Sequence, residues 1–232
     1  MALLSPSDQQ TLRAEFARMT RPVRLLLFTQ TIGCETCVQA RQIVDELPPL
    51  SDKIGVEEIN LVLGAEQAAA YGIDRVPSIA LAYEEADGAG TMRDSRIRFV
   101  GAPAGYAFIS LVRAVLLVGG DEPQISQASR ARLAAVDKPM TLQVFTTPTL
   151  PHCPRAVSLA HEMAFANPNI RAFAVEATEF PDLARRYRVT GVPKTVVDEE
   201  IEILGALPED VFVDQALSVR FAEERSDNRR ER

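Results

Sequence analysis

The stretch Ile32-Gly33-Cys34-Glu35-Thr36-Cys37 places two cysteines three positions apart, where a strand pattern gives way to a helix pattern. Before it, residues 23–28 form a short apolar run of strand length. After it, apolar residues recur at helical spacing as far as Leu47, and two prolines then end the pattern. The sequence therefore predicts that the cysteine pair opens a helix directly after a buried strand.

This placement favours thiol chemistry. A thiolate at a helix N-terminus is stabilised because it faces unpaired backbone N–H groups and the positive end of the helix dipole. We expect Cys34, at the exposed first position, to attack a disulfide, and Cys37, one turn along on the inward face, to resolve the mixed disulfide. Glu35 and Thr36 are expected to tune the site, since the charge of Glu35 opposes thiolate formation in part.

Composition narrows the class of protein. The 232 residues carry a net charge of −7, with 47% apolar and 25% charged residues, as is ordinary for a globular chain. The negative charge argues against a nucleic-acid partner, and no apolar run reaches the length of a membrane span. The N-terminus has no signal-peptide core, so a cytoplasmic location is expected. The densely charged residues 221–232 predict a solvated tail.

The cysteine count raises one alternative. Three cysteines are too few for a structural disulfide framework, but Cys34 and Cys37 could form half of a metal site. Structural zinc needs four ligands, and the remaining cysteine and both histidines lie more than a hundred residues further on. We therefore expect no metal, and no cofactor other than the redox-active disulfide between Cys34 and Cys37.

The second half of the chain repeats the first. Adding 116 to the residue number sends Cys37 to Cys153 and Pro77 to Pro193, each proline preceded by valine. One shift that relates a helix, a loop and a strand predicts two copies of one folding unit.

Beyond these positions the shift drops to 104, which sends Gly101 to Gly205. The drop indicates that a polar loop of the first copy is missing from the second. The Gly-rich stretch at 119–120 is the expected boundary, with an N-terminal unit over residues 1–119 and a C-terminal unit over 120–232.

The second copy lacks the attacking thiol. Leu150 stands at the position that corresponds to Cys34, and leucine cannot attack a disulfide. Cys153 remains at the inward position and is most simply a buried, inert thiol. Leu150, Cys153 and Pro193 are therefore expected to form a degenerate second site.

A strand, a Cys-x-x-Cys, a helix, a strand, a helix and a Val-Pro pair before the next strand resemble the thioredoxin fold. The chain is thus expected to be an α/β protein with two tandem thioredoxin-fold units, each a four-stranded mixed sheet flanked by helices. The resemblance implies that Pro77 is the cis-proline that faces the nucleophile. It also implies that the backbone of Val76 binds an extended substrate segment and that Gly101 lines the substrate groove.

Two fused units of this kind resemble the protein disulfide oxidoreductases, which are glutaredoxin-like proteins of thermophilic bacteria and archaea. The shared features are a leading amphipathic helix, Phe28-Thr29 before the cysteine pair, and Thr147-Pro148-Thr149 before the second site. Both units of that family usually carry the cysteine pair, and this chain departs at Leu150. The N-terminal domain of the alkyl hydroperoxide reductase flavoprotein is also similar, but its surviving site lies in the second unit.

The residues and the resemblance together predict a thiol–disulfide oxidoreductase that reduces protein disulfides. The resemblance implies a flavoprotein of the thioredoxin reductase type as electron donor. Two alternatives remain open. One is a dedicated electron donor to a peroxidase, and the other is a peptide-binding or chaperone module whose thiols are incidental.

Overall fold

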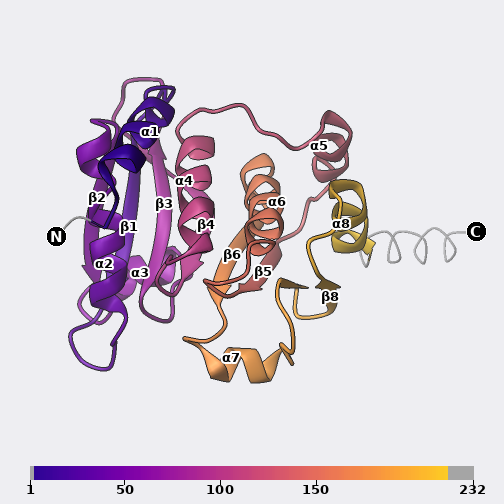
Figure 1. Ribbon diagram of the computed structural model, residues 1–232. Helices are drawn as coiled ribbons and strands as arrows, with labels where there is room; N and C mark the ends of the chain where they lie inside the picture. The colour runs from indigo at the N-terminus through magenta and orange to yellow at the C-terminus, as the bar shows by residue number, and fades with distance from the viewer. Residues whose placement is uncertain (1–2, 219–232) are drawn as a thin grey trace, which may run out of the picture.

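The computed structural model describes residues 3–218, and the predicted tail at 221–232 lies outside them. Eight strands form a single mixed sheet (Figure 1). They are β1 (Val23–Thr29), β2 (Ile54–Asn60), β3 (Ser78–Glu84), β4 (Met92–Val100), β5 (Met140–Thr146), β6 (Ile170–Glu176), β7 (Lys194–Val197) and β8 (Ile201–Leu204). Their order across the sheet is β2-β1-β3-β4-β6-β5-β7-β8.

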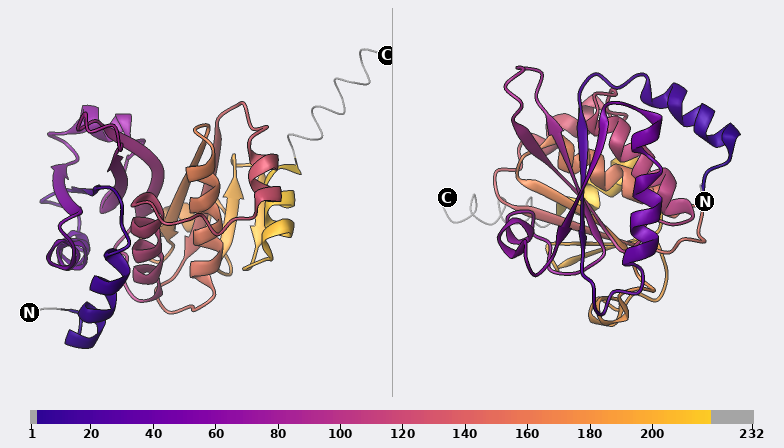
Figure 2. Two further views of the ribbon diagram at one scale, coloured as in Figure 1. Left: turned by 90° about the horizontal axis from the view of Figure 1, so that it is seen from above. Right: turned by 90° about the vertical axis from the view of Figure 1, so that its left-hand side faces the viewer.

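Helices cover both faces of the sheet (Figures 1 and 2). They are α1 (Pro6–Phe16), α2 (Cys37–Asp45), α3 (Ala65–Ala70), α4 (Tyr106–Val118), α5 (Gln127–Leu133), α6 (Cys153–Ala166), α7 (Pro181–Arg186) and α8 (Glu209–Ala216). A single 3-10 turn, Pro48–Leu50, follows α2. No helix within residues 3–218 is long and apolar enough to cross a membrane.

The strand pairing confirms two tandem units of one topology. In the first, β1 pairs parallel with β2 and antiparallel with β3, and β3 pairs antiparallel with β4. In the second, β5, β6, β7 and β8 repeat this arrangement. The sequence did not predict that the two four-stranded sheets are joined. They meet where β4 pairs parallel with β6, from Ile97 opposite Ala172 to Val100 opposite Val175.

Strand β1 shows how alternate side chains of one strand contribute to the cores on the two faces of the sheet. Successive side chains of a strand point to opposite faces, so an uninterrupted apolar run fits a strand that is buried on both. Leu25 and Leu27 belong to a large core that continues into the second unit. Leu26 and Phe28 belong to a smaller core beneath α3. A further small core lies beneath α7 and combines residues of the second unit with Val100 of β4.

Helices α4 and α6 pack against each other over the junction of β4 and β6, and the large core runs beneath both (Figures 1 and 2). On the α3 and α7 side, Arg75 bridges the units by donating a hydrogen bond of 3.1 Å to Asp182. The two units are therefore in contact on both faces of the shared sheet.

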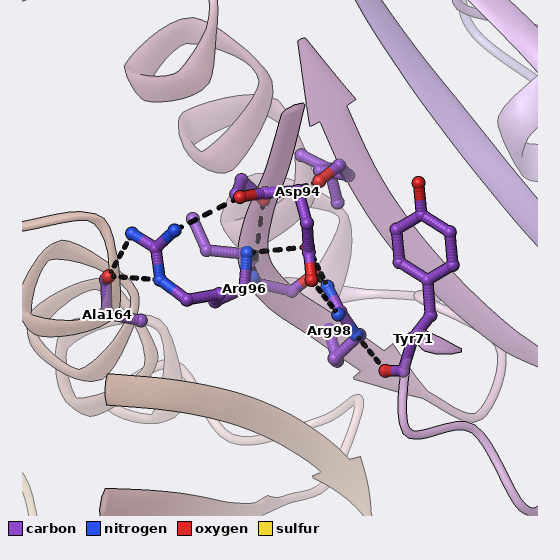
Figure 3. Close-up of polar contacts among 8 residues, drawn as sticks. Tyr71, Asp94, Arg96, Arg98 and Ala164 are labelled. Carbon is purple, nitrogen blue, oxygen red and sulfur yellow. Dashed lines mark hydrogen bonds and ion pairs between the residues drawn. The ribbon is translucent and has the colours of Figure 1, made fainter. Parts of the chain in front are cut away.

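A buried charge lies in β4 beside this junction (Figure 3). The Arg98 side chain is completely buried and donates two hydrogen bonds to the Asp94 carboxylate, at 2.8 and 2.6 Å. Its Nε donates to the carbonyl oxygen of Tyr71. Nearby, the Arg96 guanidinium donates to the carbonyl oxygen of Ala164 at the end of α6. The cluster thus links β4 to Tyr71 in its own unit and to α6 of the second unit.

Candidate active site

The two cysteines of the quoted stretch are joined as a disulfide with a Cα–Cα distance of 5.5 Å, so the structure is that of the oxidised form. Cys37 is the first residue of α2 and only 6% exposed, whereas Cys34 lies half-buried in the turn before the helix. Because Cys37 is buried, the sulfur that a partner can reach is that of Cys34. Among residues 3–218, no group of three or more histidine, cysteine or acidic side chains is placed to hold a metal ion.

The cis-proline predicted at Pro77 is present, in the Val76–Pro77 bond, and the Val192–Pro193 bond of the second unit is also cis. Pro77 directly precedes β3, whose first residue Ser78 pairs with Phe28 near the end of β1. The turn that carries the cysteines follows that same end of β1. The topology therefore brings Pro77 and the cysteine turn to one edge of the sheet.

Gly101 lies at the same edge, directly after β4. Its backbone N–H donates to the Pro77 carbonyl oxygen at 2.8 Å, and its φ of +103° favours glycine. The second unit has the corresponding hydrogen bond, in which the Gly205 N–H donates to the Pro193 carbonyl oxygen at 2.9 Å. The predicted roles of Val76, Pro77 and Gly101 in substrate binding stay predictions.

The second unit contributes a carboxylate to this site. Glu179 lies between β6 and α7, and its Oε2 accepts a hydrogen bond of 2.6 Å from the Thr36 hydroxyl. Its Oε1 accepts a hydrogen bond of 2.8 Å from the backbone N–H of Ala102. Burial raises the pKa of Glu179, while the bonds from Thr36 and Ala102 offset part of that rise. Glu179 thus ties the cysteine turn to the segment that follows Gly101.

The sequence reasoning missed Glu179 and its neighbour Glu176. Glu176 is 5% exposed and accepts hydrogen bonds from the backbone N–H groups of Thr178 and Glu179. The only sequence signal was a pair of acidic residues, one at the end of an apolar strand and one three residues later. Their approach to Thr36 depends on the pairing of β4 with β6, which joins segments more than 70 residues apart.

We expect Gly101→Ala to destabilise the fold by about 1–3 kcal/mol, measured by denaturant unfolding. A Cβ at this position would lie 2.7 Å from the Glu176 Cβ and 3.1 Å from a carboxylate oxygen of Glu179. Gly205→Ala is the matched control, because its φ of +82° is also positive and no atom lies within 4 Å of the added Cβ. Equal losses in both variants would contradict the role of the close contact.

The second site has the predicted residues but no dithiol. Leu150 is 39% exposed, and Cys153, the first residue of α6, is 2% exposed and carries a free thiol. Burial raises the pKa of the Cys153 thiol, so it is held in the protonated form. These properties fit an inert thiol.

Comparison with known proteins agrees with this architecture. Residues 140–218, in the second unit, match the model of a thioredoxin domain family. The N-terminal domain of the alkyl hydroperoxide reductase AhpF from Enterococcus faecalis superimposes with a TM-score of 0.82 at 27% identity, covering 91% of this chain and 98% of that one. A protein disulfide oxidoreductase from Aeropyrum pernix gives the same TM-score at 26% identity, covering 93% of each chain. The chain therefore consists of two tandem units of the thioredoxin fold, with a Cys-x-x-Cys disulfide in the first unit.

The relatives also include much longer proteins. The alkyl hydroperoxide reductase AhpF from Pseudomonas putida is 28% identical over 139 residues, which is 56% of this chain but 27% of that protein. The thioredoxin-like chain therefore spans about a quarter of the length of this curated relative. The similarity to the E. faecalis domain, in contrast, extends over nearly all of that chain.

Proposed function

We propose that this protein carries electrons from a flavoprotein of the thioredoxin reductase type to the disulfide of a peroxidase. The observation that supports this most directly is the match to the E. faecalis reductase domain, which covers 98% of that domain. Among curated proteins, the matches include the alkyl hydroperoxide reductase AhpF from several bacteria. A cytoplasmic setting is part of the proposal, because the Cys34–Cys37 dithiol would have to be kept reduced by its donor.

We assign the steps from the exposure of the two sulfurs. The Cys34 thiolate attacks one sulfur of the partner's disulfide, forms a mixed disulfide and releases the other partner sulfur as a thiolate. The Cys37 thiolate then attacks the Cys34 sulfur and releases the second partner thiolate. This leaves the Cys34–Cys37 disulfide present in the structure. The flavoprotein returns two electrons, and two protons restore both thiols.

The start of α2 helps the first step. The backbone N–H groups of the first turn have no partner within the helix, so they stabilise a nearby anion. Cys34 lies in the turn just before this helix start. A thiolate on Cys34 is therefore favoured over one on the buried Cys37.

A second candidate function is the general reduction of protein disulfides, supported by the similarity to the A. pernix oxidoreductase over 93% of each chain. Recognition of different disulfides would then depend on the cis-proline edge rather than on one docking partner. The third interpretation, a binding module with incidental thiols, predicts no turnover at all.

One assay separates the three. The reduced protein is mixed with insulin or with an oxidised cysteine-based peroxidase, and NAD(P)H consumption is followed with a thioredoxin reductase-type flavoprotein present. We expect kcat/KM to be at least about tenfold higher for the peroxidase than for insulin, since a dedicated donor stabilises one transition state selectively. Similar values would favour the general reductase. No turnover with either substrate, together with no reversible couple in thiol buffers, would support the binding module.

A further inference from the structure

Glu179 is held firmly at the redox site of the other unit. Both of its carboxylate oxygens accept hydrogen bonds, one from the Thr36 hydroxyl at 2.6 Å and one from the Ala102 N–H at 2.8 Å. Its own backbone N–H donates to Glu176 at 2.8 Å. Two hydrogen bonds to the carboxylate and one from the backbone thus hold Glu179 beside the cysteine turn in the oxidised form.

The hydrogen bond that the Thr36 hydroxyl makes is unusual for a residue at the start of a helix. Thr36 is the N-cap of α2, and an N-cap hydroxyl normally accepts a hydrogen bond from the first turn of its helix. The Thr36 hydroxyl makes no such bond and instead donates to Glu179. A carboxylate from the second unit therefore lies at the positive end of α2, where the Cys34 thiolate would also form. Two negative charges at one helix terminus oppose each other.

The arrangement is not repeated at the degenerate site. Glu179 reaches the first unit because it follows β6, the strand that pairs with β4. The counterpart of β4 is β8, which is the outermost strand of the sheet described over residues 3–218, and a Cβ at Gly205 meets no atom within 4 Å, whereas one at Gly101 meets Glu176 and Glu179.

We propose that Glu179 is a positioning residue that makes the Cys34–Cys37 dithiol a stronger reductant, and that the second unit contributes to the site in this way. The carboxylate destabilises the Cys34 thiolate and so disfavours the reduced form relative to the disulfide. This inference rests on the proposed redox function of the cysteine pair. It assigns a function to the unit that has lost its own nucleophile.

The test is Glu179→Gln in the full chain, equilibrated in defined thiol buffers and quantified by alkylation. Glutamine keeps an acceptor for Ala102 and a donor for Thr36 but removes the charge. We expect the equilibrium to shift about three- to tenfold toward the dithiol, or about 14–30 mV. The pKa of Cys34, measured from the pH dependence of its alkylation, should fall as well.

Two controls make the outcome decisive. Glu200→Gln makes the same charge change at an exposed turn and should leave both quantities at their wild-type values. Glu179→Asp keeps the charge and should stay closer to wild type than Glu179→Gln. An unchanged equilibrium in Glu179→Gln, beside a normal couple in wild type, would overturn the inference and leave the proposed function intact. The absence of a reversible Cys34–Cys37 redox couple in the wild-type protein would instead contradict the proposed function.

Discussion

Replacement of Cys34 by serine is expected to abolish disulfide reduction, with a loss of about 10³-fold or more in turnover. Serine has the size of cysteine, but its hydroxyl does not ionise at neutral pH and cannot form a mixed disulfide. Cys37 cannot substitute, because it is 6% exposed and begins the buried face of α2. The measurement is the initial rate of NAD(P)H-coupled reduction of the peroxidase or of insulin.

The other two cysteines supply matched controls. Cys37→Ser should still attack but should accumulate the mixed disulfide, which is visible as a covalent adduct on a non-reducing gel. Cys153→Ala should keep nearly full activity, because this thiol is 2% exposed and burial raises its pKa. Substantial turnover in Cys34→Ser, or loss of turnover in Cys153→Ala, would contradict the assignment of the attacking sulfur.

Much of this site could be predicted from the sequence, because its elements are local. The apolar run of β1, the cysteine pair and the helical stripe of α2 are consecutive in the chain. The shift of 116 depends only on matching Cys37 with Cys153 and the two Val-Pro pairs. Patterns of this kind report which face of a strand or helix is buried, and the structure confirms them at both sites.

The features that escaped prediction depend on contacts between distant segments. Nothing in the sequence of β4 or β6 says that these strands pair, yet that pairing brings Glu179 to Thr36. The hydrogen bond joins residues 143 positions apart. Acidic residues in a loop normally indicate solvent exposure, and only the assembled sheet shows that this one is half-buried beside the turn that carries the disulfide.

The ion pair of Asp94 and Arg98 escaped prediction for a related reason. Residues four apart are neighbours on a helix but lie far apart along a regular strand. Here β4 bulges, because Leu81 of β3 faces three residues of β4 between the pairs Ala80–Arg98 and Ala82–Asp94. The bulge brings the two charged groups within 2.6 Å. A strand pattern alone does not reveal such a bulge.

We expect Asp94→Ala to lower the free energy of unfolding by about 2–4 kcal/mol, because it leaves the fully buried Arg98 guanidinium without its counter-ion. Burial alone would raise the pKa of Asp94, but the hydrogen bonds and charge of Arg98 outweigh it and hold that pKa below the usual value. The pair therefore stabilises the fold above the pKa of an unfolded aspartate, about 3.9, and this contribution is lost as pH falls through the lower folded pKa. Denaturant unfolding at pH 7 and at acid pH measures both effects.

Two further variants separate the ion pair from the loss of a side chain. Asp52→Ala removes an aspartate whose side chain is 93% exposed and should cost little. The double variant Asp94→Ala/Arg98→Met removes both charges, so its loss should be smaller than the sum of the two single losses. Strict additivity, or a loss in Asp94→Ala no greater than in Asp52→Ala, would mean that the pair does not stabilise the junction. The expected coupling would instead show that the fold relies on this charge pair where β4 meets the second unit, at the same strand junction that brings Glu179 to the redox site.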